Sequence, residues 1–427
     1  STDTTSYAAP TISALSGAAV SDLGSSTLGN TPIVISGNNF GAEGTTIPIV
    51  KYGPEGFPAR YTAQGCIVKG HRKIQCETQA GVGLGHKWQI VSVAGSRSTS
   101  VFQGKTTQYE RPAITGVAAG ADSATTGGES VTITGTNFGP ASDTAVVAKY
   151  GASDSNPTTY TATGCRVVSQ TSITCNTVEG TGASLHWRVT VDGQDSGVST
   201  TTTDYANPSI DSDGLSGDAM AVLGSDTRGG ASITIRGANF GPDGNANVVV
   251  TYGPDGALNP YTAASCAVTG GGHDTITCST VEGIGNNLYW VVQIAAQSSV
   301  RSVQKSRYLK PSLTSLSGNA FTGRSPTQGQ MSIMLVGNYF GPAGDSDVAA
   351  FYGPSGDTKR YEAVGCKVLS GNDQVHVNIE CKTNVGVGAN LVWTVRVGDQ
   401  ESLTSTNTCR CCNNNNAVRL LLQRGLW

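Results

Sequence analysis

Eleven cysteines offer the most specific chemistry in this sequence. Eight of them form four pairs that recur with a period of about 100 residues: Cys66 and Cys76, Cys165 and Cys175, Cys266 and Cys278, and Cys366 and Cys381. Regular pairs of this kind predict disulfides made in an oxidising compartment. Zinc is the alternative, but zinc ligands usually lie closer together and include histidine. The five histidines do not follow the cysteines in phase, so we expect disulfides and no metal site.

Three further cysteines, Cys409, Cys411 and Cys412, lie in a tail that has no counterpart elsewhere in the chain. Three thiols cannot all pair with one another, so at least one stays free or reaches a neighbouring chain. A covalent link between subunits and a disordered tail are the alternatives that the sequence leaves open.

Serine and threonine hydroxyls form the second chemical group. Only 13% of the residues are charged, about half the usual share, so solubility needs another source. N-linked glycans are blocked at Asn156 and Asn207, because proline follows each of them. We predict O-linked glycans, although threonine also suits the solvent face of a strand. The candidate acceptors are Thr158, Thr159, Thr161, Ser199, Thr200, Thr201, Thr202, Thr203, Thr404 and Thr406.

Catalytic and nucleic-acid chemistry are not predicted. The sequence has no nucleophile elbow, zinc-protease motif or phosphate-binding loop before a helix. Acidic residues such as Asp211 and Asp243 do not recur in phase, and His86 and His186 are expected to pack or to face solvent. The net charge of −3 and the absence of a recurring basic cluster argue against DNA or RNA partners. We therefore expect neither an enzyme nor a cofactor.

A cassette that is repeated four times must position the cysteine pairs. It runs from Gly-x-x-Phe-Gly through Tyr-Gly and the cysteine pair to Trp. Alternating β-branched residues before each Phe predict a half-buried strand, and glycine is expected where the turn needs positive φ. Each cysteine pair brackets a hairpin, and a strand begins at each Trp. In the first repeat this strand breaks its pattern at Ser92, where we expect a bulge or a weaker strand. The aromatic residues are Phe40, Phe138, Phe240 and Phe340; Tyr52, Tyr150, Tyr252 and Tyr352; and Trp88, Trp187, Trp290 and Trp393.

This order of motifs resembles the IPT/TIG branch of the immunoglobulin-like domains, over residues 10 to about 408. The chain departs from the family pattern in lacking the proline that often follows the second cysteine, where Asn176 stands instead. The resemblance implies an all-β fold of four tandem immunoglobulin-like (IPT/TIG) β-sandwich domains in an extracellular receptor, adhesin or surface protein. Another branch of the family dimerises DNA-binding transcription factors, which the cysteine usage disfavours. The expected parts are a segment like a closing strand at 1–9, domains at 10–109, 110–205, 206–308 and 309–408, and a tail at 409–427.

Consecutive domains meet at a Tyr-x-x-Pro motif without a linker. The joint residues are Tyr109 and Pro112, Tyr205 and Pro208, and Tyr308 and Pro311. Because proline fixes φ, we expect limited bending, a tyrosine packed into each interface, and a rod.

The first ten residues repeat such a joint. They match residues 199–208, a closing strand with its joint, at seven of ten positions. Either a longer array continues upstream, or the segment docks on the fourth domain of the preceding molecule by strand addition. Residues 402–408 can supply the closing strand of that domain, which weighs against a strict missing-strand mechanism. The inter-subunit strand would comprise Ser1, Thr2, Asp3, Thr4, Thr5, Ser6 and Tyr7.

Two functions are consistent with these features. The first is a structural subunit of an extracellular fibril or surface coat, which associates with itself end to end and laterally and carries O-glycans. The second is an adhesion or receptor ectodomain that binds a protein or glycan. The sequence has no signal peptide or apolar run of 18 residues and begins with Ser1, which predicts a processed, secreted product at the cell surface or outside the cell.

Overall fold

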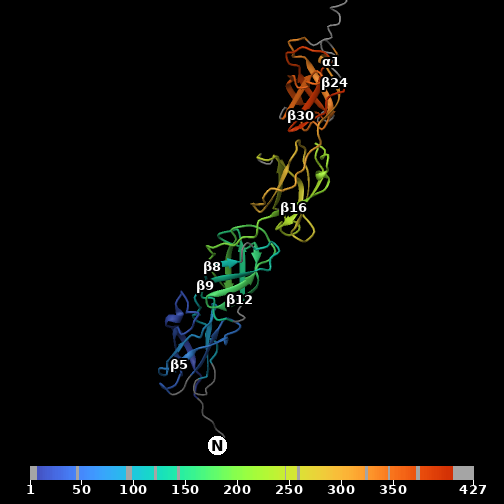
Figure 1. Ribbon diagram of the computed structural model, residues 1–427. Coiled ribbons are helices and arrows are strands. Elements are labelled where there is room, and N and C mark those ends of the chain that lie inside the picture. The colour runs from blue at the N-terminus through green and yellow to red at the C-terminus, as the bar shows by residue number, and fades with distance from the viewer. Residues whose placement is uncertain are drawn as a thin grey trace, which may run out of the picture. The chain divides into compact units, whose positions relative to one another are not determined.

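The computed structural model describes residues 7–44, 48–92, 99–119, 123–141, 145–245, 247–256, 260–322, 326–344, 347–371 and 376–406. The chain separates into two compact units, residues 1–206 and 207–427. Each unit contains two β-sandwich domains, and each domain has two antiparallel sheets (Figure 1). The predicted all-β fold of four sandwiches is thus confirmed.

The strands repeat from domain to domain. The first domain contains β1 (Thr11–Ser16), β2 (Pro32–Asn38), β3 (Ile49–Gly53), β4 (Tyr61–Thr62), β5 (Gln64–Val68), β6 (Lys73–Glu77) and β7 (Lys87–Ser92), with a 3-10 turn, η1 (Ala18–Val20). The second contains β8 (Ala113–Ala119), β9 (Ser130–Thr136), β10 (Val146–Gly151), β11 (Tyr160–Thr161), β12 (Thr163–Ser169), β13 (Ser172–Asn176), β14 (His186–Val191) and β15 (Gln194–Asp195).

The second unit has the same pattern. The third domain contains β16 (Ser209–Ser216), η2 (Asp218–Met220), β17 (Ser232–Ala238), β18 (Val248–Gly253), β19 (Tyr261–Thr262), β20 (Ala264–Val268), β21 (Thr275–Ser279), β22 (Tyr289–Ile294) and β23 (Gln297–Ser298). The fourth contains β24 (Ser312–Ser317), α1 (Asn319–Thr322), β25 (Ser332–Asn338), β26 (Val348–Gly353), β27 (Tyr361–Glu362), β28 (Val364–Val368), β29 (Asn378–Lys382), β30 (Val392–Val397) and β31 (Gln400–Glu401).

One sheet of the second domain has the order β12-β13-β9-β8 and the other the order β11-β10-β14-β15, and the third and fourth domains repeat both orders. In the first domain the second sheet is β4-β3-β7. The register between β3 and β7 shifts between Ile49, opposite Ser92, and Val50, opposite Ile90. This shift confirms the irregularity expected at Ser92.

The Tyr and the Trp of each cassette meet across two strands. Tyr150 on β10 is the register partner of Trp187 on β14, and their rings stack with centroids 4.2 Å apart. The other domains have the same stacked pair, and all four Trp side chains are fully buried. The spacing of the cassette therefore reflects a cross-strand pair at the centre of each core.

Glycine is required at the two ends of the Phe turn for different physical reasons. In the second domain, positive φ falls on Asn137 (63°) and on the second glycine, Gly139 (85°). The first glycine, Gly135, has no positive φ, so the expectation of a positive φ there was wrong. A Cβ at Gly135 would collide with the Ala113 carbonyl oxygen and with the ring of Phe138. Glycine is required at position 135 because the neighbouring strand and the buried Phe138 ring leave no space for a Cβ.

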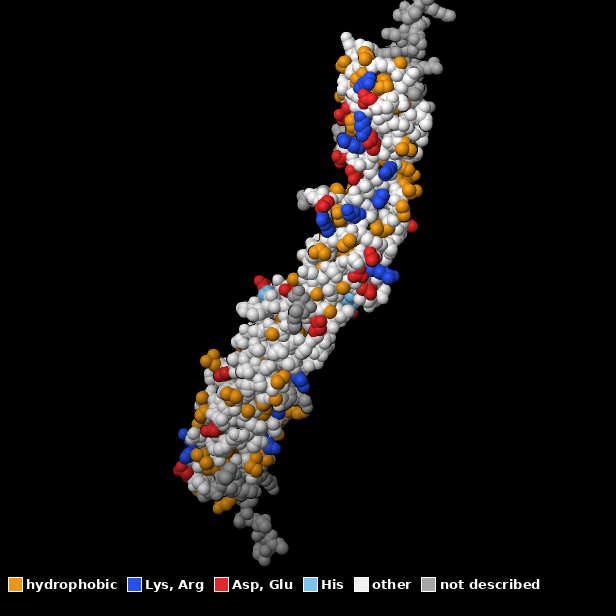
Figure 2. All heavy atoms as spheres, viewed as in Figure 1, with side chains coloured by type: hydrophobic (Ala, Val, Ile, Leu, Met, Phe, Trp, Pro, Cys, Tyr) orange, Lys and Arg blue, Asp and Glu red, His pale blue; other side chains and the backbone are white. Residues whose placement is uncertain are grey.

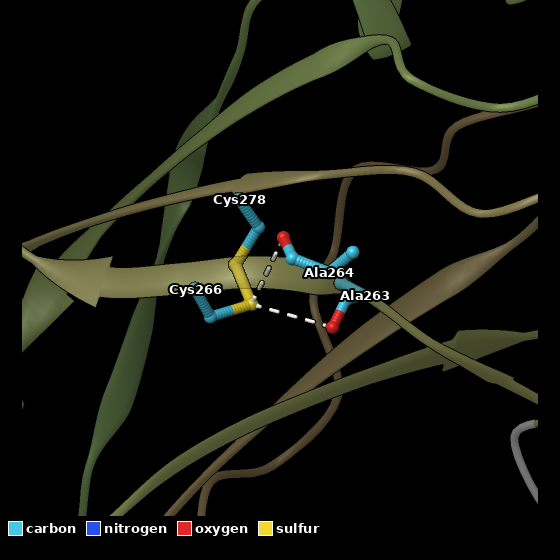
Figure 3. The surroundings of a disulfide bond; sticks show 4 residues. All are labelled: Ala263, Ala264, Cys266 and Cys278. Atoms are coloured by element: carbon cyan, nitrogen blue, oxygen red, sulfur yellow. Dashed lines mark hydrogen bonds between the residues drawn. A yellow bond between two sulfur atoms is a disulfide. The ribbon is translucent and has the colours of Figure 1, made fainter. Parts of the chain in front are cut away.

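A disulfide closes each cysteine hairpin. The bonded pairs are Cys66–Cys76, Cys165–Cys175, Cys266–Cys278 and Cys366–Cys381. Each bond joins two antiparallel neighbours, such as β20 and β21 in the third domain (Figure 3). The Cys266 sulfur lies 3.7 Å from the Ala263 carbonyl oxygen, a packing contact, since a disulfide sulfur has no hydrogen to donate.

Charged side chains are sparse on the face shown in Figure 2, where uncharged polar groups and backbone dominate. No helix among the described residues has the length and apolar character needed to cross a bilayer. Within the same residues, His, Cys, Asp and Glu side chains do not gather in threes as a metal site requires.

Candidate functional site: the joints between domains

The joint between the first and second domains is built around an apolar side chain. Val82 lies in the turn after β6 of the first domain, is only 3% exposed, and belongs to the hydrophobic core of the second domain. It contacts Gly139, where a Cβ would overlap the Val82 side chain. The Phe turn of the second domain thus forms a socket for the preceding domain.

The joint between the third and fourth domains repeats this contact. Ile284 occupies the position of Val82 and packs against the core of the fourth domain. A Cβ at Gly341, which follows the buried Phe340, would overlap the Ile284 side chain. One apolar side chain in one socket is therefore the common element of both joints.

A threonine of the preceding domain makes a polar contact beside each socket. At the first joint, Thr27 donates from Oγ1 to Gln170 Oε1 (2.8 Å), and Gln170 Nε2 donates to the Thr27 carbonyl (2.9 Å). At the other joint, Thr227 Oγ1 lies 2.9 Å from His376 Nδ1, and Glu282 lies 3.6 Å from the other ring nitrogen. Burial lowers the pKa of His376, and the charge of Arg228 lowers it further.

A hairpin tip of the following domain reaches back at each joint. Gln194 donates from Nε2 to the Tyr109 carbonyl at 2.9 Å, and Gln400 donates in the same way to Tyr308 at 3.0 Å. Next to the first of these, Arg60 forms an ion pair of 2.7 Å with Asp192. Each joint therefore combines an apolar contact with two sets of directional hydrogen bonds.

The joint tyrosines belong to the domains that they close. Tyr109 is 1% exposed and lies in the core of the first domain, where its hydroxyl is 2.7 Å from that of Tyr52. Burial raises the pKa of Tyr109, and Tyr52 raises it further. The same hydroxyl pair occurs at Tyr205 and at Tyr308. The expectation that the tyrosine packs into the interface was wrong, because its ring lies in the core of its own domain. At the two described joints it is the carbonyl of Tyr109 or Tyr308 that accepts a hydrogen bond from the following domain.

The same closing segment holds the buried Trp. Trp187 donates from Nε1 to Thr203 Oγ1 at 2.9 Å, two residues before the joint tyrosine. Trp88 donates to Thr107 and Trp290 to Ser306 with the same length. Each of these three domains is thus closed by a Ser/Thr-x-Tyr sequence that pairs with its Trp and Tyr.

The second domain matches the family model of the IPT/TIG domain over residues 112–205. The other three domains repeat its sequence cassette and its sheets. The chain is a tandem IPT/TIG-domain protein. A search of curated proteins finds no match to its sequence.

Several solved structures are similar to this IPT/TIG protein at low identity. The extracellular region of plexin A4 is 14% identical, with 91% of this chain and 36% of the plexin chain covered and a TM-score of 0.22. Domains FN1–FN3 of chicken CNTN1 are 13% identical, with 69% and 96% covered and a TM-score of 0.23. Invasin, a bacterial integrin-binding protein, is 12% identical, with 92% and 78% covered and a TM-score of 0.22. The chain spans about a third of the plexin chain.

In the fourth IPT/TIG domain, the residues equivalent to those of the described joints are exposed. Val387 takes the position of Val82 and Ile284 but is 64% exposed, and Thr327, equivalent to Thr27, is exposed as well. At the other end of the chain, His71 takes the position of Gln170 and His376 and is exposed. The first and fourth domains therefore each have residues equivalent to one half of a joint, and these residues are exposed.

The structure distinguishes among the hydroxyls proposed as glycan acceptors. Ser199 and Thr203 are buried and bind the Trp187 backbone and indole, so they are not available in the folded domain. The exposed candidates are Thr158, Thr159, Thr161, Thr200, Thr201, Thr202, Thr404 and Thr406.

The remaining residues proposed from the sequence include some that lie outside the described part of the chain. Ser1–Ser6 of the proposed inter-subunit strand and the tail cysteines Cys409, Cys411 and Cys412 lie outside, whereas Tyr7 is described and 98% exposed. His86 is a buried packing residue at the first joint. Sequence reasoning did not find the contacts of Val82 and Ile284, although an apolar residue between the two glycines was their visible signal.

Proposed function

We propose that this chain is a structural subunit of an extracellular filament or surface coat and that its molecules associate end to end through the same joint that connects its domains. The observation that carries this proposal is the exposure of Val387, 64%, against 3% for Val82 at the same position inside the chain. Burial of a valine side chain contributes about 1.5–3 kcal/mol, so covering the exposed Val387 would favour association. The first domain offers the matching socket at Phe40 and His71.

The composition of the exposed surface also supports this proposal. Low charge and exposed threonines suit O-glycans or lateral contact between filaments, and four disulfides suit an oxidising, extracellular location. We expect native protein to exceed the mass of its polypeptide and to lose the excess on chemical removal of O-glycans. If Cys409, Cys411 or Cys412 crosslinks subunits, oligomers on a non-reducing gel will dissociate with a thiol reductant.

Replacing Val387 by aspartate tests the end-to-end contact. An uncompensated carboxylate in an apolar socket is costly, so Val387→Asp should leave monomers where the unmodified chain forms linear assemblies. Sedimentation velocity and electron microscopy of the full chain measure this.

The matched control is Leu403→Asp. Leu403 is 89% exposed in the same domain, and its equivalent Val300 stays 78% exposed in the third domain, which is joined to the fourth. This variant should assemble as the unmodified chain does. Monomers of the unmodified chain under native conditions would contradict the filament proposal and favour an adhesion or receptor ectodomain.

A further inference from the structure

The joint between the third and fourth domains contains a cavity of about 440 Å³. Its walls come from both domains and are mainly apolar, and they include the buried side chains of Leu288 and Phe340. Two exposed acidic residues, Asp347 and Asp399, line it as well. None of the described lining residues is Lys, Arg or His. The cavity therefore combines apolar walls with negative charge, at a size that is typical of sites for small groups or ligands.

The first joint has a positive side chain at the equivalent place. Arg60 precedes Tyr61 of β4, and its guanidinium lies 5.2 Å from the centre of the Tyr61 ring and 2.7 Å from the Asp192 carboxylate of the second domain. In the third domain the equivalent tyrosine is Tyr261, since each of the two is the register partner of its domain's core tyrosine. The residue before Tyr261 is Pro260, which lines the cavity. The cavity therefore lies where the first joint holds a guanidinium group.

Asp399 has the same neighbours in the preceding domain as Asp192. Each lies in the hairpin tip of the following domain, one or two residues before the glutamine that contacts the joint tyrosine. A Cβ at Gly83 would collide with the Asp192 carboxylate, and a Cβ at the equivalent Gly285 would lie 3.7 Å from the Asp399 carboxylate. Asp399 accepts a hydrogen bond of 2.9 Å from the backbone N–H of Asn286. This neutral donor leaves the charge of Asp399 without a cation among the described residues.

Asp347 places a second negative charge beside Tyr261. Burial raises the pKa of Tyr261, and the charge of Asp347 raises it further. At the first joint burial likewise raises the pKa of Tyr61, and Asp192 raises it further, but the charge of Arg60 lowers it. Among the described residues, the third and fourth domains thus supply the carboxylates of the joint and not the cation that balances them.

We propose that this cavity binds an arginine side chain of a partner protein, in the place that Arg60 has at the first joint. The apolar walls suit the aliphatic stem of arginine, and the Tyr261 ring suits stacking of the guanidinium. Asp347 and Asp399 supply the charge and the hydrogen-bond acceptors. Lysine matches this site less well, because its ammonium is a strongly hydrated point charge. Val387 is not among the lining residues, so this inference does not depend on the proposed assembly.

Binding of short peptides to the full chain tests the proposal. The probes are the capped peptide Gly-Gly-Arg-Gly-Gly and the same peptide with lysine or with citrulline, an uncharged isostere of arginine, in the central position. Saturation-transfer NMR measures the Kd of each. We expect the arginine peptide to bind about tenfold more tightly than the citrulline peptide, because hydrogen bonds between charged groups are the stronger ones, and more tightly than the lysine peptide. Equal affinity for the arginine peptide and either of the others, or no binding of any, would overturn the proposal.

Two charge variants of the full chain locate the binding at the cavity. Asp347→Asn and Asp399→Asn keep the size of the side chain and remove its charge, so each should weaken binding of the arginine peptide about tenfold. Asp213→Asn is the matched control, because Asp213 is an exposed acid on β16 of the third domain and does not line the cavity. This control should bind the peptide as the unmodified chain does. Unchanged affinity in both cavity variants would overturn the proposal.

Pro260→Arg supplies the guanidinium from within the chain. The new side chain should fill the cavity as Arg60 does at the first joint, and binding of the arginine peptide should fall about tenfold or more. Pro260→Ala is the control, since it removes the proline without adding a charge and should retain binding. Calorimetry checks that both variants keep the melting profile of the unmodified chain. Undiminished binding by a folded Pro260→Arg chain would show that the peptide binds elsewhere and would overturn the proposal.

Discussion

Replacement of Gly135 by alanine is expected to unfold the second domain well below the temperature at which the other three unfold. The added Cβ would overlap the Ala113 carbonyl oxygen on β8 and the buried ring of Phe138. Neither obstacle is the free end of a flexible side chain, because one is backbone and the other is held in the core. Overpacking of this kind costs about 3 kcal/mol, which for a domain of this size corresponds to roughly 12 °C or more in melting temperature.

Gly197→Ala is the matched control in the same domain. Gly197 is exposed, and an added Cβ would meet nothing within 4 Å. Differential scanning calorimetry of the full chain should show one transition displaced by Gly135→Ala and none displaced by Gly197→Ala. Equal melting profiles for the two variants would show that β8 and β9 can separate to admit a methyl group. This result would contradict the steric requirement for glycine at position 135.

The sequence predicted those parts of the fold that depend on local pattern. Alternating residues around Ile133 and a Trp at fixed spacing from the cysteines are sufficient to predict strands, hairpins and a core, because period and burial are both visible in the chain. The role of Gly135 was not visible, since a close approach between strands depends on register. The pairing of Tyr150 with Trp187 is likewise a product of register.

The site was less predictable because it depends on contacts between domains. The motif Tyr-x-x-Pro marks each expected joint in the sequence, but whether the Tyr109 ring faces the interface or its own core depends on side-chain direction. Val82 is one apolar residue in a glycine-rich turn, and only its burial against Gly139 reveals its role. The buried indole of Trp393, whose Nε1 has no hydrogen-bond partner among the described residues, shows the same limit, since this difference is recognised only after the equivalent bonds of Trp88, Trp187 and Trp290 are known.

His86 is expected to make the first domain sensitive to acid. It takes the core position that Leu185, Leu288 and Leu391 occupy in the other domains. The side chain is 1% exposed, and its Nε2 has no partner among the described residues. Burial lowers the pKa of His86 to about 4, an effect that Arg60 reinforces and that Asp192 and the Val82 carbonyl partly oppose. Neutral rings surround it, those of Tyr52, Tyr61 and Tyr109.

The sign of the effect follows from the two pKa values. The folded value of about 4 lies below the ordinary value of 6.5, so the unfolded chain binds more protons between these limits. Stability is complete above pH 6.5, falls as the pH decreases, and levels off near pH 4. The total loss from this group is about 3 kcal/mol, and about 2 kcal/mol of it is present at pH 5.

His86→Leu should remove this loss and leave the other three domains unchanged. Leucine fits a position that the fold already fills with leucine, and it removes a buried nitrogen that lacks a partner, which adds about 1 kcal/mol at neutral pH. Calorimetry of both full chains at pH 7 and pH 5 should show one transition that is higher in the variant, by a larger margin at pH 5. A margin that does not change with pH would mean that the His86 ring has the same pKa in the folded domain as in the unfolded chain, and would contradict the effect of burial on its protonation.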